Sequence, residues 1–371
     1  MSNLSIRLRV QAITLSAAAS LALHAAPATA QHYVRANLTS DQSAVASHID
    51  THLVNPWGMS RGGGSPWWIS DNGTGVATIY DAVGAAQPLV VIIPPGDPTR
   101  NSTGNPTGTV FNGGTGFELA PGKPAFFLFV TEDGTVSGWN PGVAASKAVI
   151  KVNTKGASIF KGAALATVPN GSGGRTSFLY ATDFLQGKVQ VWDQAFHRVV
   201  LSAGQFEDAQ LPAGYAPFNI QNIGGELYVT FAAQDSDKHD EVDGAGLGRV
   251  DVFSTSGQLL RRLDHGSWLN APWGLAMASG DFGIFSHDLL VGQFGSGTIA
   301  VYDPVTGHFK GLLQNSANTA ITIPGLWGLS FGSGTASGAA NSLYFTAGAD
   351  HEAHGLFGNI KAVENTGGNS N

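Results

Sequence analysis

A repeated apolar segment constrains the fold of this chain more than any other feature of its sequence. Six short runs of apolar and aromatic residues recur about every 50 to 60 residues. They are WWIS (67–70), FFLFV (126–130), FLYA (178–181), LYVT (227–230), DLLV (288–291) and LYFT (343–346). Most are followed by a Gly turn and a second strand-like segment ending in an aromatic residue and Asp, as in DNGTGVATIYD (71–81) and QFGSGTIAVYD (293–303). A further strand-like segment lies on each side, so each repeat contains four strands.

Four-stranded repeats of this length are typical of β-propellers. The sequence therefore predicts an all-β, six-bladed β-propeller over residues 33–361. The last repeat shows only three strands, within 326–331, 342–348 and 355–363. The segment 33–38 lies before the first blade, and we expect it to supply the missing outer strand and close the ring, which removes an exposed sheet edge. The 50 glycines of the 371-residue chain fit a fold with many turns.

The two ends of the chain read differently from the repeats. Residues 1–30 combine a basic start (Arg7, Arg9), an apolar run and the small residues Ala28-Thr29-Ala30, which is the order found in a cleaved secretory signal peptide. The alternative is a buried N-terminal helix. The polar segment 362–371 is expected to be a disordered tail. We therefore expect an exported protein, either periplasmic or secreted from the cell.

Charge and cysteine content exclude several classes of function. Without residues 1–30 the chain has 17 basic and 26 acidic residues, a balance that argues against nucleic-acid binding. There are no cysteines, so disulfides, thiolate catalysis and cysteine-bound metals are excluded. No later segment has the length of apolar sequence that a transmembrane helix needs.

Chain direction predicts where the polar side chains gather. In an antiparallel blade the second strand ends on the face where the first strand begins. Acids and amides occupy these two positions in several repeats, and we expect them at one mouth of the central channel as ligand-binding residues. They are Asn55, Asp71, Asn105, Glu132, Asp183, Asn219, Asn270 and Gln293. By contrast Asp81, Asp193 and Asp303 follow the third strand on the opposite face, where they read as turn residues that bond their own backbone.

One loop at the predicted mouth concentrates carboxylates. The segment QDSDKHDEVD (234–243) has five acids in ten residues, and carboxylate oxygens are the ligands that calcium prefers. Calcium or another divalent cation is therefore a candidate cofactor, although the loop does not match an EF-hand, and a solvated acidic loop is the alternative. The candidate ligands are Asp235, Asp237, Asp240 and Asp243. His351 and His354 form a second, weaker metal candidate, for which an exposed polar turn is the alternative.

The remaining motifs are structural or absent. Trp57, Trp273 and Trp327 each precede a glycine in the first strand of a blade, and this regularity favours packing near the axis over a ligand-binding role. No motif for a nucleophilic serine, a phosphate loop or a zinc protease is present.

Several motifs together resemble a family of exported bacterial β-propellers that is distantly similar to NHL-repeat proteins. They are NPWG (55–58), TEDGTVSGWNP (131–141), YAPFNIQNIGG (215–225), QDSDKHD (234–240) and GLWGLSFG (325–332). The resemblance covers residues 37–361 and implies the fold and export, but it carries over no catalytic residue. A weaker resemblance links Asn55, Glu132, Asp183 and Asn270 to the metal ligands of calcium-dependent lactonase propellers. The Glu-Gly-Pro opening of those enzymes is replaced here by NPWG, which leaves their first metal ligand without a match.

Two functions follow as hypotheses. The first is a binding or scaffold protein whose acidic channel mouth recognises a small molecule, or an extracellular protein or glycan. The second is a metal-dependent hydrolase or lactonase, in which the ion would polarise an ester carbonyl and a nearby carboxylate would act as base. Propellers host both kinds of activity, so the fold alone does not choose between them.

Overall fold

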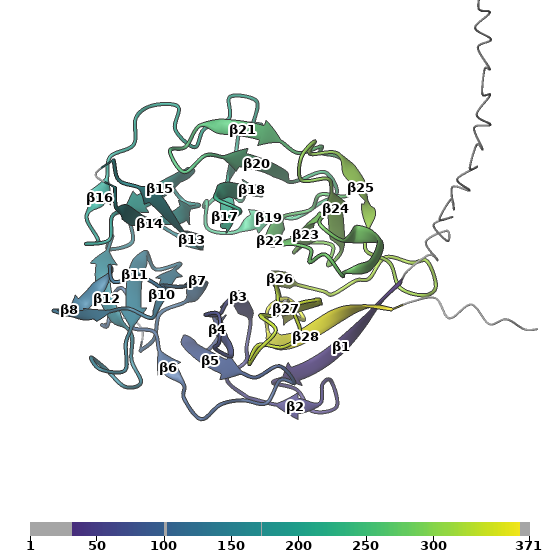
Figure 1. Cartoon of the computed structure of the whole chain (residues 1–371), viewed down its shortest axis with the longest axis horizontal. Coiled ribbons are helices and arrows are strands. Elements are labelled where there is room, and N and C mark those ends of the chain that lie inside the picture. Colours follow the sequence, from purple (N-terminus) through teal and green to yellow (C-terminus); the bar gives the residue numbers. More distant parts are fainter. Residues whose placement is uncertain (1–31, 100–101, 172, 364–371) are drawn as a thin grey trace, which may run out of the picture.

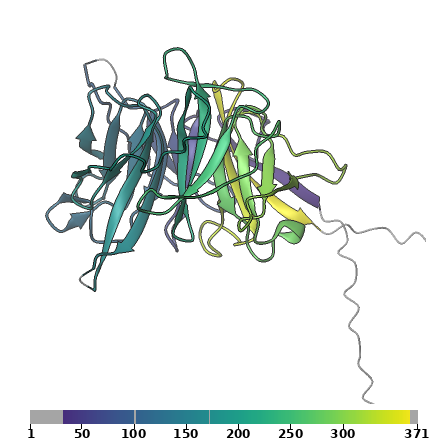
Figure 2. The ribbon, with the colours of Figure 1, turned by 90° about the horizontal axis from the view of Figure 1, so that it is seen from above.

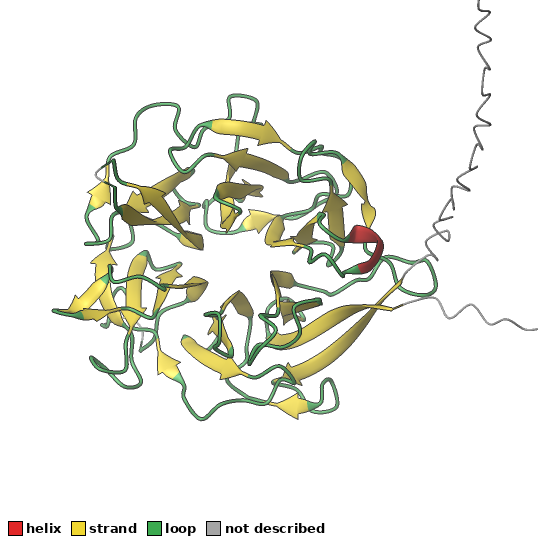
Figure 3. Cartoon of the chain, viewed as in Figure 1, coloured by secondary structure: helices red, strands yellow, loops and turns green. Residues whose placement is uncertain are grey.

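Six β-sheets stand around a central axis like the blades of a propeller (Figure 1). The computed structural model describes residues 32–99, 102–171 and 173–363. The predicted signal peptide and all but two residues of the predicted tail lie outside these ranges. Strands and loops make up the described chain except for one short 3₁₀ helix, η1 (Gly283–Phe285) (Figure 3). Figure 2 shows the disc from the side, with strands that run between its two faces.

Each blade contains four antiparallel strands, ordered from the axis outward. Blade 1 contains β3 (Pro56–Ser60), β4 (Trp67–Asp71), β5 (Val76–Tyr80) and β6 (Val91–Ile92). Blade 2 contains β7 (Pro106–Phe111), β10 (Phe127–Thr131), β11 (Thr135–Trp139) and β12 (Val149–Asn153), with a small hairpin of β8 (Glu118–Ala120) and β9 (Lys123–Pro124). Blade 3 contains β13 (Phe160–Pro169), β14 (Arg175–Asp183), β15 (Lys188–Trp192) and β16 (Arg198–Val199).

The second half of the ring repeats this order. Blade 4 contains β17 (Tyr215–Ile223), β18 (Glu226–Gln234), β20 (Arg249–Phe253) and β21 (Leu259–Arg262), and β19 (Glu241–Val242) pairs with β18. Blade 5 contains β22 (Pro272–Met277), β23 (Leu289–Gln293), β24 (Ile299–Tyr302) and β25 (Phe309–Leu312). Blade 6 contains β26 (Leu326–Phe331), β27 (Ser342–Ala349) and β28 (His354–Val363), with β1 (His32–Ser40) as its fourth antiparallel strand. The short β2 (His48–Ile49) lies outside β1 and runs parallel to it. The predicted six-bladed fold is thus confirmed.

The two ends of the described chain close the ring together. β1 pairs with β28 in antiparallel register from His32 opposite Val363 to Ser40 opposite Leu356. This confirms the predicted closure by an N-terminal strand, which is longer than the predicted segment 33–38. Ala362 and Val363, which the sequence placed in the tail, are the last residues of β28. The hydroxyl of Tyr33 donates a hydrogen bond of 2.9 Å to the carbonyl of Phe282 and so ties the closing strand to blade 5.

The middle strands of the blades are buried on both faces. Every residue of β4, β5, β10 and β11 is buried, because each blade is covered by a neighbour on either side. This burial explains why the repeats read as continuous apolar runs rather than as alternating patterns. The core therefore lies between the blades, as a set of separate apolar clusters around the ring.

Aromatic side chains fill the centre of the ring. Trp57 and Trp327 stack with ring centroids 3.5 Å apart, and Trp273 and Phe218 meet them edge-on. All four are buried, which confirms the predicted packing role of the tryptophans. The innermost strands approach one another closely: a Cβ on Gly274 would lie 2.4 Å from the carbonyl oxygen of Trp327 in the next blade.

The turns after the third strands behave as predicted. The Oδ1 atoms of Asp81, Asp193 and Asp303 each accept two hydrogen bonds from backbone N–H groups two to four residues further along the chain. These aspartates therefore have a local structural role. Within the described ranges, no helix has the length and apolar character needed to cross a membrane.

Candidate functional site

The start of the first strand lies beside the end of the second strand in blades 1, 3 and 5. Pro56 is opposite Asp71, Phe160 is opposite Asp183, and Pro272 is opposite Gln293. This register gathers the loops between second and third strands, and those that lead into the first strands, on one face of the disc. We call the polar centre of that face the channel mouth.

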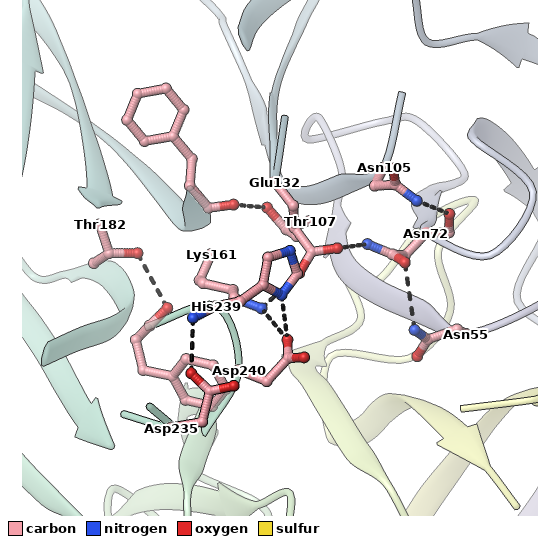
Figure 4. Close-up of polar contacts among 12 residues, drawn as sticks. Asn55, Asn72, Asn105, Thr107, Glu132, Lys161, Thr182, Asp235, His239 and Asp240 are labelled. Carbon is pink, nitrogen blue, oxygen red and sulfur yellow. Dashed lines mark hydrogen bonds and ion pairs between the residues drawn. The ribbon is translucent and has the colours of Figure 1, made fainter. Parts of the chain in front are cut away.

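A buried lysine occupies the centre of the channel mouth. Lys161 comes from β13 and its side chain is fully buried. Its Nζ atom lies 2.5 Å from Oε1 of Glu132 in blade 2 and 3.1 Å from Oδ1 of Asp240 in the blade 4 loop (Figure 4). Beneath it lie the rings of Trp57 and Phe184, with centroids 5.0 and 5.9 Å from Nζ. The ammonium group is therefore held by carboxylates above an aromatic floor, a setting that stabilises its charge.

A chain of amides extends the channel mouth toward blades 1 and 6. Nδ2 of Asn72 donates to Oε2 of Glu132 at 2.8 Å, and Nδ2 of Asn55 donates to Oδ1 of Asn72 at 3.4 Å. Asn105 donates to the backbone carbonyl of Asn72 at 3.5 Å. Oδ1 of Asn55 accepts a hydrogen bond of 3.0 Å from Nε1 of Trp327. These contacts orient Glu132 and join blades 1, 2 and 6 into one network, and Figure 4 shows the part formed by Asn55, Asn72, Asn105 and Glu132.

The acidic loop folds back over the channel mouth. Oδ1 of Asp235 accepts from the backbone N–H of His239 at 2.9 Å, and the Asp235 N–H donates to the carbonyl of Asp240, also at 2.9 Å. Val242 in β19 pairs with Ala233 in β18, which closes the loop at its far end. Asp240 consequently reaches Lys161, and Nδ1 of His239 lies 2.8 Å from the same carboxylate.

The charges of this cluster shift one another. Burial by itself would lower the pKa of Lys161, but Glu132, Glu241 and Asp240 outweigh it and raise that pKa above its ordinary value. The hydrogen bond with His239 and the charge of Lys161 hold the pKa of Asp240 well below its usual range. Lys161 is therefore a permanent cation, and Asp240 a permanent anion, throughout the physiological range of pH.

Two further carboxylates behave in the opposite way. Burial, together with repulsion from Glu352 and Asp240, raises the pKa of Glu241 to about 8. Burial, together with repulsion from Glu132 and Asp240, raises the pKa of Glu352 to about 7. Near neutral pH both groups exchange protons readily, so they can respond to a charge that enters the channel mouth.

Three of the predicted ligand-binding residues lie inside the sheets. Asp71, Asp183 and Gln293 are fully buried. Asp71 accepts from Thr78 at 2.7 Å, Asp183 accepts from Gln190 at 2.5 Å, and Gln293 accepts from the Asn270 backbone at 2.8 Å. Alternation along the strand explains this placement, because neighbouring residues point to opposite sides. In blade 1 it is the next residue, Asn72, that reaches the channel mouth.

Two predicted amides also have other roles. Asn219 does not begin a strand: it lies in the middle of β17, and its Nδ2 donates to the carbonyl of Trp273 at 2.7 Å. The sequence prediction put Asn219 at the start of this strand, but β17 already begins at Tyr215. The innermost strands of the other five blades have a glycine at the matching position, namely Gly58, Gly108, Gly162, Gly274 and Gly328. Oδ1 of Asn270 accepts from the Gly244 N–H at 2.6 Å and so fastens the end of the acidic loop to blade 5. Of the predicted set, Asn55, Asn105 and Glu132 belong to the network of the channel mouth.

The candidate metal ligands are dispersed. Asp237 is exposed on the loop, whereas Asp243 and His351 line a neighbouring pocket. Nδ1 of His354 pairs with Asp41 at 2.7 Å. In the described part of the chain, one group of three side chains has ligand atoms within 4.8 Å of one another, namely Glu132, His239 and Asp240. Lys161 already contacts two of these three, so an ion bound among them would meet its ammonium group.

Sequence reasoning missed Lys161, Glu241 and Glu352. The signal for Lys161 was present, since Lys161-Gly162 stands at the register of Trp57-Gly58 in the first strand of its blade. Because a lysine at the position of a buried tryptophan places its ammonium group inside the ring, carboxylate partners are expected beside it. Glu352 was missed because Asp350, His351 and Glu352 all have positive φ angles. This local conformation could not be predicted from the sequence.

Comparison with known proteins places the chain in a family. It is 32% identical to uncharacterized protein R648 of Acanthamoeba polyphaga mimivirus over 333 residues, which cover 87% of this chain and 78% of that protein. It is 30% identical to uncharacterized protein L690 of the same virus over 335 residues, covering 87% and 84%. No protein-family model matches.

Solved structures agree on the fold. A structural-genomics protein of unknown function from Bacteroides thetaiotaomicron superposes with a TM-score of 0.54 at 8% identity, covering 90% of this chain and 76% of that one. A streptogramin B lyase structure gives a TM-score of 0.48 at 11% identity, covering 91% and 100%. At 8% identity, the likeness to the Bacteroides protein concerns the fold alone and shows nothing about activity. By its sequence, the chain belongs to the same family as the uncharacterized proteins R648 and L690 of mimivirus.

Proposed function

We propose that this protein is an exported ligand-binding propeller, and that its channel mouth binds a positively charged group of a small molecule. The observation that carries the proposal is the charge balance of the channel mouth. Four carboxylates, from Glu132, Asp240, Glu241 and Glu352, act on one buried ammonium group, that of Lys161. These carboxylates outnumber the cations of the site, which are Lys161 and His239, whose pKa is raised by its hydrogen bond with Asp240. Burial is the main cause of the raised pKa values of Glu241 and Glu352, and a cation that entered would offset it by favouring their ionised forms.

Proton release supports a specific form of this binding. Glu241 and Glu352, with pKa values of about 8 and 7, are partly protonated at neutral pH. A bound cation favours their ionised forms, so binding expels protons and becomes tighter as pH rises. Each proton released contributes up to about tenfold in affinity per pH unit between pH 6 and 8.

Calorimetry with matched ligands tests the proposal. The probes are 1,5-diaminopentane and benzylamine, compared with the neutral 1,5-pentanediol and benzyl alcohol, each titrated at pH 6 and pH 8.5 in two buffers of different ionisation enthalpy. We expect the amines to bind with proton release and the alcohols to bind weakly or not at all. Glu352→Gln should reduce the proton release, whereas Asp281→Asn, an exposed site on another loop, should not. Equal affinity for amines and alcohols would contradict the proposal.

A metal-dependent hydrolase is the second candidate, favoured by one observation. Glu132, His239 and Asp240 form a compact group with the chemistry of a divalent-ion site. Lys161 argues against a metal ion at this place, because its Nζ atom lies 2.5 Å from Glu132 and 3.1 Å from Asp240. Metal analysis of the purified protein, with lactone and ester hydrolysis measured before and after chelation, separates the two functions. A stoichiometric divalent ion together with chelator-sensitive hydrolysis would favour the enzyme.

Export can be tested independently of the ligand. We propose that residues 1–30 direct the chain through a secretion pathway and are removed. When the full chain is expressed in a Gram-negative host, mass spectrometry of the periplasmic fraction should find a protein that begins at or near Gln31. Retention of the intact chain in the cytoplasm would count against export.

A further inference from the structure

A pocket of about 390 Å³ lies beside the channel mouth, on the same face of the disc. We call it the blade 5–6 pocket. Its walls come from the end of the acidic loop of blade 4 and from loops of blades 5 and 6. The residues around it include Asp243, Phe294, Ser296, Pro324, Asp350 and His351. Its volume falls in the range of about 300–1,000 Å³ that is usual for small-molecule sites.

Two glycines in the wall of this pocket pack closely against the residues behind it. Gly348 lines the pocket, and a Cβ at this position would lie 2.3 Å from Oδ1 of Asn55, so Gly348 contacts both the pocket and an amide of the channel mouth. A Cβ on Gly325, also in the lining, would lie 2.0 Å from the carbonyl of Gly348. Neither position has room for a side chain. The segment that leads into β26 therefore packs backbone to backbone against the end of β27, and the Gly348 N–H donates a hydrogen bond of 2.9 Å to the Gly325 carbonyl.

Aromatic contacts form a second connection. Phe294, in the pocket wall, stacks on Trp327 with ring centroids 4.1 Å apart. Trp327 stacks in turn on Trp57 at 3.5 Å, and Lys161 lies over Trp57 at 5.0 Å. The pocket and the charged cluster thus rest on one continuous aromatic layer.

The charged groups of the pocket are acidic. Asp243 and Asp350 line it together with His351, and the described residues of the lining include no lysine or arginine. Asp350, His351 and Glu352 have φ angles of 52°, 53° and 67°. This left-handed turn costs roughly 1–2 kcal/mol per residue for side chains other than glycine. Within this one strained turn, Asp350 and His351 border the pocket while Glu352 acts on the channel mouth.

We propose that the blade 5–6 pocket binds the body of an organic ammonium compound, with its apolar part against Phe294 and Pro324 and its charge toward Asp243 and Asp350. The inference deepens the function proposed above, the binding of a cationic small molecule, and rests on it, since it identifies a second place on the same face where an ammonium group and its apolar part can bind. An acidic pocket with an aromatic wall selects a flat or aliphatic amine over a neutral or anionic molecule of the same shape. A ligand that bears two amines would span the pocket and the channel mouth.

Benzylamine is the probe that tests the pocket, with benzyl alcohol and benzoate as its neutral and anionic counterparts. Binding is measured by saturation-transfer NMR and by calorimetry on the full chain. The double variant Asp243→Asn/Asp350→Asn should weaken benzylamine by at least about tenfold and leave benzyl alcohol unchanged. Phe294→Leu should weaken benzylamine and benzyl alcohol alike. Asp281→Asn is the matched control and should change neither.

The outcomes separate the pocket from the channel mouth. If the double variant binds benzylamine as tightly as the wild type while Glu352→Gln weakens it, the pocket proposal is wrong and the mouth proposal stands. If the double variant weakens benzylamine and Glu352→Gln alters neither affinity nor proton release, the pocket stands and the mouth proposal is wrong. Benzoate that binds better than benzylamine would overturn the pocket proposal, as would an absence of any benzylamine signal in NMR.

Discussion

At the scale of single residues, Lys161 decides the character of the channel mouth. Its side chain is fully buried, and the carboxylate of Glu132, which is 12% exposed, is its closest partner. Asp240 is 63% exposed, so solvent screens its share of the attraction. A buried ion pair contributes little in net terms when intact, but leaving one member alone is costly.

Removal of this ammonium should therefore destabilise the fold. We expect Lys161→Met to lower the free energy of unfolding by roughly 3 kcal/mol, because Glu132 is left as a largely buried, unpaired charge. The double variant Lys161→Met/Glu132→Leu should regain much of that loss. Urea denaturation followed by fluorescence measures both. A single variant as stable as the wild type would show that Lys161 is not what compensates Glu132.

The raised pKa values of Glu241 and Glu352 predict how stability depends on pH. In the folded protein these groups keep their protons up to about pH 8 and 7, whereas the ordinary value for the side chain is 4.5. The folded state binds more protons than the unfolded state in this window, so the free energy of unfolding falls as pH rises from about 4.5 to 8. Each group contributes a slope of up to about 1.4 kcal/mol per pH unit.

The contribution of Glu352 can be isolated by substitution. Urea denaturation at pH 5, 6 and 7 should give a shallower decline in stability for Glu352→Gln than for the wild type, since the amide does not ionise. The difference should be largest at pH 7 and above. Parallel curves for the two proteins would mean that Glu352 titrates normally in the folded state.

At the scale of strands, the innermost positions of the blades control how closely the sheets approach the axis. A Cβ on Gly274 would lie 2.4 Å from the Trp327 carbonyl oxygen and 2.8 Å from Cγ of Leu329. A backbone oxygen in a paired strand cannot move aside cheaply. We expect Gly274→Ala to cost roughly 1–3 kcal/mol of stability through overpacking.

A glycine in open space provides the matched control. Nothing lies within 4 Å of the position a Cβ would take on Gly64, so Gly64→Ala should leave the denaturation midpoint nearly unchanged. If the two alanine variants were equally stable, the close approach of β22 to β26 would not limit the packing. The comparison needs only denaturation curves of three proteins.

At the scale of the whole molecule, closure by the N-terminal strand holds the ring together. β1 covers the outer edge of β28, which would otherwise expose a row of unpaired backbone groups. A chain that lacks residues 1–40 should therefore aggregate or lose its cooperative unfolding transition. A synthetic peptide of residues 32–49 added during refolding should restore a soluble species, as judged by size-exclusion chromatography. A soluble, cooperatively folded truncation would show that closure by β1 is dispensable.

Closure depends on more than backbone pairing. Tyr33→Phe removes the hydrogen bond of 2.9 Å to the Phe282 carbonyl but keeps the buried ring, which stacks near Phe285. The expected loss is about 1 kcal/mol, because one buried carbonyl loses its partner. Thermal denaturation should register it as a small decrease in Tm with the transition still cooperative.

Much of this architecture was predictable from local sequence. The apolar runs indicated the number of blades, since the middle strands are largely covered on both sides by neighbouring blades and are therefore rich in apolar residues. The chain direction of an antiparallel blade correctly placed the start of β3 beside the end of β4. Even the turn role of Asp303 followed from its position after a third strand. These properties depend on residues that are near one another in the chain, so the repeat alone was enough to specify them.

The composition of the channel mouth was decided only by the tertiary structure. Lys161 meets Glu132 and Asp240 across separations of 29 and 79 residues, from blades whose relative rotation no local pattern encodes. Neighbouring residues point in different directions, so Asp71 lies inside the sheet whereas Asn72 reaches the channel mouth. The pairing of β3 with β4 also has a register irregularity between Pro56 and Met59, close to this position. The sequence by itself thus determined a closed ring with an acidic face. The packing of the six blades around a common axis decided which carboxylates lie together and that Lys161 is the cation they contact.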